Sequence, residues 1–75
     1  MVTLSSAFGT LDISTRPKRR QVVALIIMEL SRLRLQEEAY MQRIPQNLQY
    51  SEAASAAEDS IDLLTDAIDA LEDAY

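Results

Sequence analysis

Five aspartates recur at three- and four-residue steps near the end of the chain, and carboxylates at this spacing are its first candidates for chemistry. They are Asp59, Asp62, Asp66, Asp69 and Asp73. On a helix such steps place side chains on one face, and Mg²⁺ and Ca²⁺ bind carboxylate oxygens. All five would project from one straight helix, however, with no loop and no second ligand set to complete a coordination sphere. We therefore predict no metal site and interpret the aspartates as a solvated acidic face that can bind a partner protein.

A basic cluster is the second candidate. It comprises Arg16, Lys18, Arg19 and Arg20, grouped around Pro17. Cationic side chains bind nucleic-acid phosphates electrostatically. No aromatic residue interleaves the cluster, and the chain has a net charge of −5. Nucleic acid is therefore not the expected partner, and these side chains are expected to face carboxylates of the same chain or of a partner.

Residues for catalysis are missing from the sequence. It contains no His and no Cys, which removes the commonest general base, the commonest metal ligand and any thiol nucleophile. With a single Gly, it also has no glycine-rich loop that could cradle a phosphate. We predict that the protein is not an enzyme and has no cofactor.

Helical periodicity dominates the end of the chain and predicts a helix over residues 51–75. Apolar residues follow one another at four- and three-residue steps: Tyr50, Ala54, Ala57, Ile61, Leu64, Ile68, Leu71 and Tyr75. This heptad pattern is typical of a helix that lies along another helix, as in a coiled coil. Beside it runs a row of mostly small residues, which permits close packing: Ala53, Ala56, Ser60, Leu63, Ala67, Ala70 and Ala74.

A second helix is predicted over residues 16–44. Ser14 or Thr15 can cap its start, and Pro45 disfavours helical geometry at Ile44. Its apolar stripe consists of Val22, Ile26, Leu30, Leu33, Tyr40 and Ile44. Glu37 interrupts the stripe, either as a buried carboxylate or, as we expect, at its rim with an Arg or Tyr partner. Leu25, Met28 and Leu35 point elsewhere and need another cover.

The break at residues 45–50 is too short for the helices to be anything but antiparallel. We therefore predict an all-α fold, a helical hairpin over residues 16–75, with Leu48 and Tyr50 closing its turn end. Residues 1–15 form an N-terminal tail, disordered or extended, in which Phe8, Leu11 and Ile13 are either free or folded over the helices or over a partner. The uncovered apolar side chains predict that two hairpins associate into a four-helix bundle.

Charge is divided between the two predicted helices. Residues 16–43 carry seven basic and three acidic side chains, whereas residues 51–75 carry eight acidic and no basic ones. In an antiparallel hairpin the basic cluster lies beside the acidic end of the second helix. We expect ion pairs there to select the register and the apolar seam to supply most of the stability.

The turn carries a family resemblance. Arg43-Ile44-Pro45-Gln46-Asn47-Leu48-Gln49, then Ser51-Glu52 and Ala57-Glu58-Asp59-Ser60-Ile61-Asp62-Leu63-Leu64, resembles a family of small proteins from phages, prophages and low-GC Gram-positive bacteria. Its turn reads Met-Pro-Glu-Asn-Leu-Gln, so Ile44 and Gln46 depart from it. The resemblance covers about residues 36–75 and implies a helical hairpin without implying an activity.

Two functions remain open from the sequence. The first is a non-catalytic scaffold that self-associates, most simply as a dimer. The second is a small acidic inhibitor of phage type that mimics nucleic acid and binds a basic groove on a host protein. The longest apolar run, residues 22–28, is too short to span a bilayer, and residues 1–15 lack the pattern of a signal peptide. The expected location is the cytoplasm of a bacterium or of a phage-infected cell.

Overall fold

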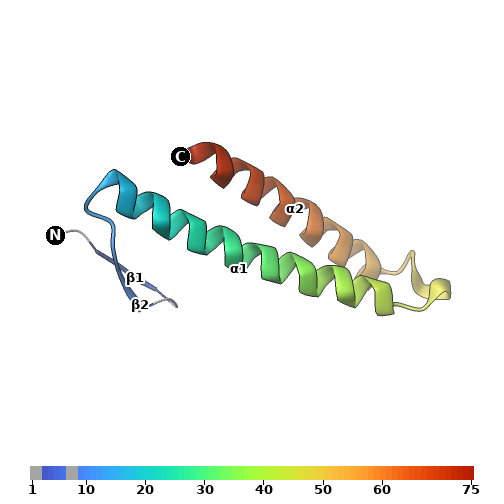
Figure 1. The fold of residues 1–75 in the computed structure, drawn as a ribbon. Helices are drawn as coiled ribbons and strands as arrows, with labels where there is room; N and C mark the ends of the chain where they lie inside the picture. Colours follow the sequence, from blue (N-terminus) through green and yellow to red (C-terminus); the bar gives the residue numbers. More distant parts are fainter. Residues whose placement is uncertain (1–2, 7–8) are drawn as a thin grey trace.

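Two long antiparallel helices form most of the molecule. The computed structural model describes residues 3–6 and 9–75, with side chains from residue 11 onward. The elements are β1 (Thr3–Ser6), β2 (Gly9–Asp12), α1 (Arg16–Arg43), a short 3-10 helix η1 (Gln46–Leu48) and α2 (Glu52–Ala74). Figure 1 shows α2 returning along α1 after the turn. The predicted helical hairpin is confirmed.

Local signals account for the ends of both helices. The Thr15 hydroxyl accepts a hydrogen bond from the Lys18 amide at 3.3 Å, and the Ser51 hydroxyl accepts one from the Ala54 amide at 3.3 Å. Each cap satisfies an amide that has no partner within its helix. Helix α1 ends at Arg43, because Ile44 precedes Pro45 and takes an extended conformation with ψ of 126°.

The turn does not close the end of the hairpin as predicted. Backbone groups of the turn form hydrogen bonds with one another: the Leu48 amide donates to the Pro45 carbonyl, and the Ser51 amide donates to the Leu48 carbonyl. Leu48 remains 48% exposed and Tyr50 is fully exposed. The prediction that these two side chains plug the helix pair is therefore wrong: Tyr50 points into solvent, and Leu48 lines an open groove with Tyr40 and Ala53.

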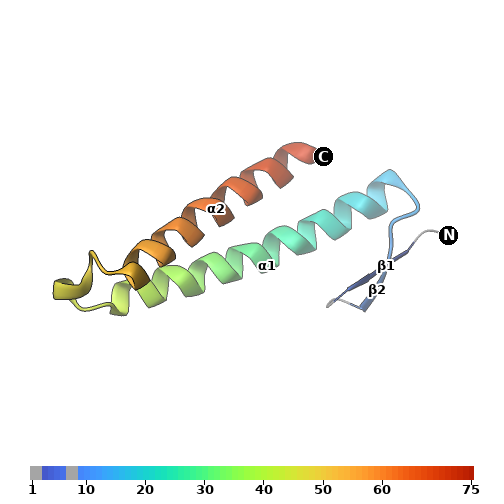
Figure 2. The same cartoon turned by 180° about the vertical axis from the view of Figure 1, so that it is seen from behind.

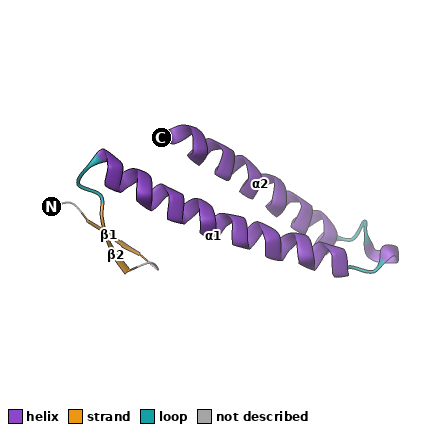
Figure 3. Ribbon diagram, in the orientation of Figure 1, coloured by secondary structure: helices purple, strands orange, loops and turns teal. Residues whose placement is uncertain are grey.

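A β-hairpin precedes α1. Strands β1 and β2 (Figure 3) pair antiparallel. Leu4 lies opposite Leu11 and Ser6 opposite Gly9. Figures 1 and 2 place the pair beside the first half of α1, and β2 contacts that helix. Leu11 and Ile13 are half-buried, whereas Phe8 lies outside the described residues.

The molecule is a rod with a thin core. It measures 54 × 24 × 15 Å, and its radius of gyration is 16.0 Å, against about 11 Å for a compact domain of this length. The buried hydrophobic residues among those described are Val22, Ala54, Ala57 and Ile68. Since two of the four are alanines, little apolar surface is fully enclosed between the helices.

Candidate interaction surface

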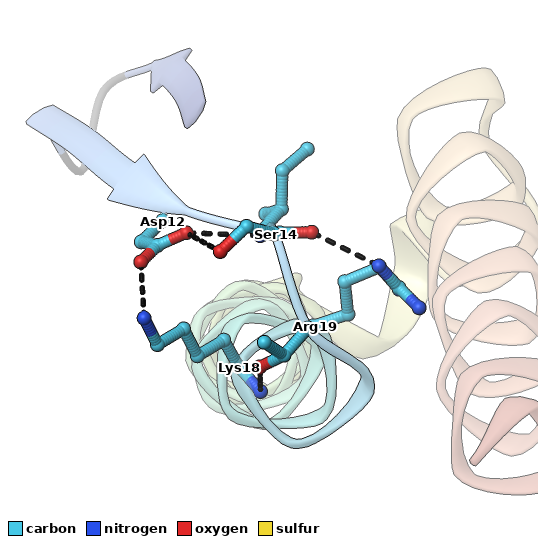
Figure 4. A network of polar contacts seen from close by, with 6 residues as sticks. Asp12, Ser14, Lys18 and Arg19 are labelled. Atoms are coloured by element: carbon cyan, nitrogen blue, oxygen red, sulfur yellow. Dashed lines mark hydrogen bonds and ion pairs between the residues drawn. The ribbon is translucent and has the colours of Figure 1, made fainter. Parts of the chain in front are cut away.

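The basic cluster forms a junction between the β-hairpin and α1. The Asp12 carboxylate accepts hydrogen bonds from the Ser14 amide at 2.9 Å and the Ser14 hydroxyl at 2.6 Å, and it pairs with the Lys18 ammonium (Figure 4). The Arg19 guanidinium donates to the Ile13 carbonyl at 3.1 Å. Two of the four basic residues are thus committed to holding the chain segment that leads into α1.

The hydrogen bonds of this junction also change the pKa of the Asp12 carboxyl group. The hydrogen bond from Lys18, followed by those from Ser14, lowers the pKa of Asp12 from 3.8 to about 2. A carboxylate that gains donors is favoured in its ionised form. The lowered pKa therefore keeps the Asp12 carboxylate ionised in the neutral and mildly acidic range.

The expected ion pairs between the two helices are not formed. Among residues 11–75 the ion pairs are Lys18–Asp12, Arg32–Glu29 and Arg34–Glu38, and none of them joins α1 to α2. Arg16 instead lies over the Tyr75 ring, 4.8 Å from its centroid. Because no ion pair among these residues joins α1 to α2, the prediction that ion pairs select the register of the hairpin is wrong. One cation–π contact joins the helix ends there.

The acidic face of α2 is entirely solvated. Asp59, Asp62, Asp66, Asp69 and Asp73 are all exposed. Within the described part of the chain, no three carboxylates converge closely enough to hold a metal ion. The arrangement leaves a one-sided negative surface rather than a ligand set.

The residues predicted for the core and for self-association divide into three groups. Val22, Ala57 and Ile68 are buried. Half-buried are Ile26, Leu30, Ile44, Ile61, Leu64 and Leu71. Exposed are Leu33, Tyr40, Leu48 and Tyr75. The contact between the two helices therefore buries fewer residues than the sequence pattern predicts.

Arg34 lies between the two helices at the position where the sequence pattern predicts Leu33. The Arg34 guanidinium contacts the Thr65 hydroxyl across the helix pair at 3.4 Å, and that hydroxyl donates to the Ile61 carbonyl at 2.8 Å. Arg34 is half-buried, whereas Leu33 is 55% exposed. Sequence periodicity missed this polar contact, because Leu33 and Arg34 are both one helical turn beyond Leu30 and hydrophobicity alone favoured the leucine.

An apolar surface lies along one side of the hairpin. We call it the apolar flank, and it comprises the apolar residues Leu33, Tyr40, Leu48, Ala53 and Leu63, with the small polar Ser60 among them. A shallow groove of about 380 Å³ runs between Leu33 of α1 and Leu63 of α2, with Glu37 on its wall. A second groove, of about 350 Å³, lies nearer the turn between Tyr40, Leu48 and Ala53. Both grooves are open and mostly apolar.

The β-hairpin covers the continuation of this flank. By helical spacing Val22, Leu33 and Tyr40 share one side of α1. Val22 is buried at 7% exposure, whereas Leu33 and Tyr40 are 55% and 43% exposed. Figure 4, seen along α1, places β2 on a side of the helix away from α2. The flank is thus buried at Val22, in the half of α1 that β2 contacts, and open at Leu33 and Tyr40, in the half that leads to the turn.

Comparison with known proteins supplies no function. No protein-family model matches the chain, and neither a curated protein nor a solved structure matches it. No described helix is long and apolar enough to cross a membrane. The chemistry of the surface is therefore the basis for a functional proposal.

Proposed function

We propose that this protein is a non-catalytic helical interaction module that self-associates through the apolar flank into a four-helix bundle. The observation that carries the proposal is the pair Leu33 and Leu63, which face solvent at 55% and 68% exposure on the two sides of one groove. A second hairpin laid on this flank buries both leucines and fills the groove.

The accessible area supports the same proposal. The chain exposes 5640 Å², whereas a folded monomer of 8.4 kDa typically exposes about 4,600 Å². The surplus is about 1,000 Å², and a standard interface removes about 800 Å² from each partner. One dimer interface is therefore about the size of the excess.

The mass in solution tests this proposal. Light scattering on a sizing column, across a hundredfold range of concentration, is expected to give a dimer that dissociates on dilution. Leu33→Glu should shift the protein to monomer, because it places a charge in the buried groove. The sequence pattern alone favours Leu25, Met28 and Leu35 as the association surface, whereas the flank proposed here does not include them. Leu35→Glu is therefore the matched control: Leu35 is on the same helix at 63% exposure but off the flank, so this variant should remain dimeric. A wild-type monomer at all concentrations, or equal effects of both variants, would refute the proposal.

The acidic face supports a second candidate function, a nucleic-acid mimic that occupies a basic groove of a host protein. The supporting observation is that none of the carboxylates of α2 takes part in an ion pair within the described residues. Replacing Asp62, Asp66 and Asp69 with Lys separates the two functions. A scaffold keeps its mass. An inhibitor displaces duplex DNA from a purified DNA-binding protein and loses this ability in the triple variant.

The resemblance of the turn to phage and low-GC Gram-positive proteins favours a bacterial or phage-infected cytoplasm as the setting. Expression in such a host, followed by fractionation, tests the location.

A further inference from the structure

We propose that the second copy docks with its turn at the same end as the first, so that α1 of each copy packs against α2 of the other. This inference rests on the proposed self-association and specifies its geometry. Two observations carry it: the distribution of charge between α1 and α2, and the position of the β-hairpin on the flank.

Two-fold symmetry leaves two arrangements when identical flanks face each other. If the symmetry axis runs parallel to the helices, both turns lie at one end and each α1 faces the α2 of the other copy. If the axis runs across the helices, the turns lie at opposite ends, and α1 faces α1 while α2 faces α2.

Charge favours the first arrangement. Helix α2 carries eight carboxylates and no basic residue, so an α2–α2 contact would bring two acidic helices together. Like charges that face each other across an interface oppose association. Helix α1 instead presents Arg43 on the groove near the turn, and Arg43 takes part in no ion pair within the described residues. With the turns together, Arg43 lies at the level of the start of α2 in the other copy, where Glu52 is located.

The β-hairpin favours the same arrangement. It lies beside the first half of α1 (Figures 1 and 2), so the open part of the flank is the half that leads to the turn. When the turns lie together, the open halves of the two copies overlap and both β-hairpins lie beyond the contact. When the turns lie apart, full overlap places the open half of each copy against the covered half of the other.

Single-cysteine spin labelling distinguishes the two arrangements, because the chain has no cysteine of its own. Gln46→Cys places a label in the exposed turn, and Ala74→Cys places one at the exposed end of α2. Each labelled dimer contains one pair of spins, so pulsed dipolar spectroscopy reads only the distance between copies. Circular dichroism and scattering mass of both variants verify that fold and assembly are retained.

With the turns together, the two spins of a labelled dimer should be separated by less than the length of α2, whether the label is at Gln46 or at Ala74. With the turns apart, the Ala74 pair should be separated by at least the length of α2, about 35 Å at 1.5 Å per residue. A long Ala74 distance in a dimer overturns the geometry while self-association stands. A monomeric wild-type protein overturns both the geometry and the function proposed above.

Discussion

Ile68 and Leu63 lie on the same helix but should contribute to different equilibria. Ile68 is the largest of the buried residues, at 4% exposure, whereas Leu63 is 68% exposed on the flank. Ile68→Ala is therefore expected to destabilise the hairpin itself. Leu63→Ala is expected to leave the isolated hairpin nearly unchanged and to weaken the association of two copies.

The magnitudes follow from the burial. Ile68→Ala removes three buried carbons, a transfer cost of about 2.4 kcal/mol, and the residual cavity brings the typical loss to about 2–4 kcal/mol. A domain of this length has a total stability of about 4–11 kcal/mol. Leu63→Ala should cost less than about 1 kcal/mol in the monomer, since most of that side chain is already in water.

Urea unfolding followed by far-ultraviolet circular dichroism measures both effects. It is performed at a concentration at which light scattering shows a monomer, and then at a hundredfold higher concentration. With a slope near 1 kcal/mol per molar urea, Ile68→Ala should lower the midpoint by about 2 M or more at both concentrations. Leu63→Ala should lower it only at the higher one. An equal loss for the two variants in the dilute sample would show that the seam described above is wrong.

Three further predictions concern the charges and the caps. Asp12 should titrate near pH 2 by NMR, and Lys18→Ala should return its pKa toward 3.8. Because the folded pKa is lowered, the contribution of Asp12 to stability is present above about pH 3.8 and is lost as the pH falls through about 2; a titration at the ordinary value would contradict the junction. Ser51→Ala should cost about 1 kcal/mol through loss of the N-cap, and an unchanged urea midpoint would contradict this cap. In a monomeric sample, raising NaCl from about 0.01 M to about 0.5 M should raise the melting temperature, since screening weakens repulsion along α2; a decrease would show that attractions such as Lys18–Asp12 outweigh this repulsion.

The sequence was sufficient to predict the helical hairpin. Pro45 ends α1 and Ser51 caps α2, and these effects act over a few residues, so they do not depend on tertiary contacts. The heptad pattern was informative for α2, where Ala57 and Ile68 are buried as the spacing predicts. Local chemistry and periodicity agree in this part of the chain.

The sequence was insufficient wherever tertiary contacts decide between neighbouring residues. Leu33 and Arg34 are adjacent on α1, and the contact of Arg34 with Thr65 depends on the position of α2, which the local sequence does not specify. The β-hairpin has four-residue strands, which are too short for a periodicity of two to identify. Lys18 was expected to face α2 but pairs with Asp12, because the β-hairpin brings a carboxylate closer than α2 does.

The unpaired negative charge of α2 also gives a physical reason why binding a second copy would stabilise this chain. Within α2, Asp59, Asp62, Asp66, Asp69 and Asp73 repel one another at helical spacing, at about 0.2–0.5 kcal/mol for each neighbouring pair. No basic side chain forms an ion pair with these carboxylates within the described residues, and the thin core offers little to offset the repulsion. Packing a partially cationic α1 from a second hairpin against α2 reduces the repulsion and buries Leu63 in one step. Folding and association are therefore expected to be coupled, with the stability of the hairpin rising with its concentration.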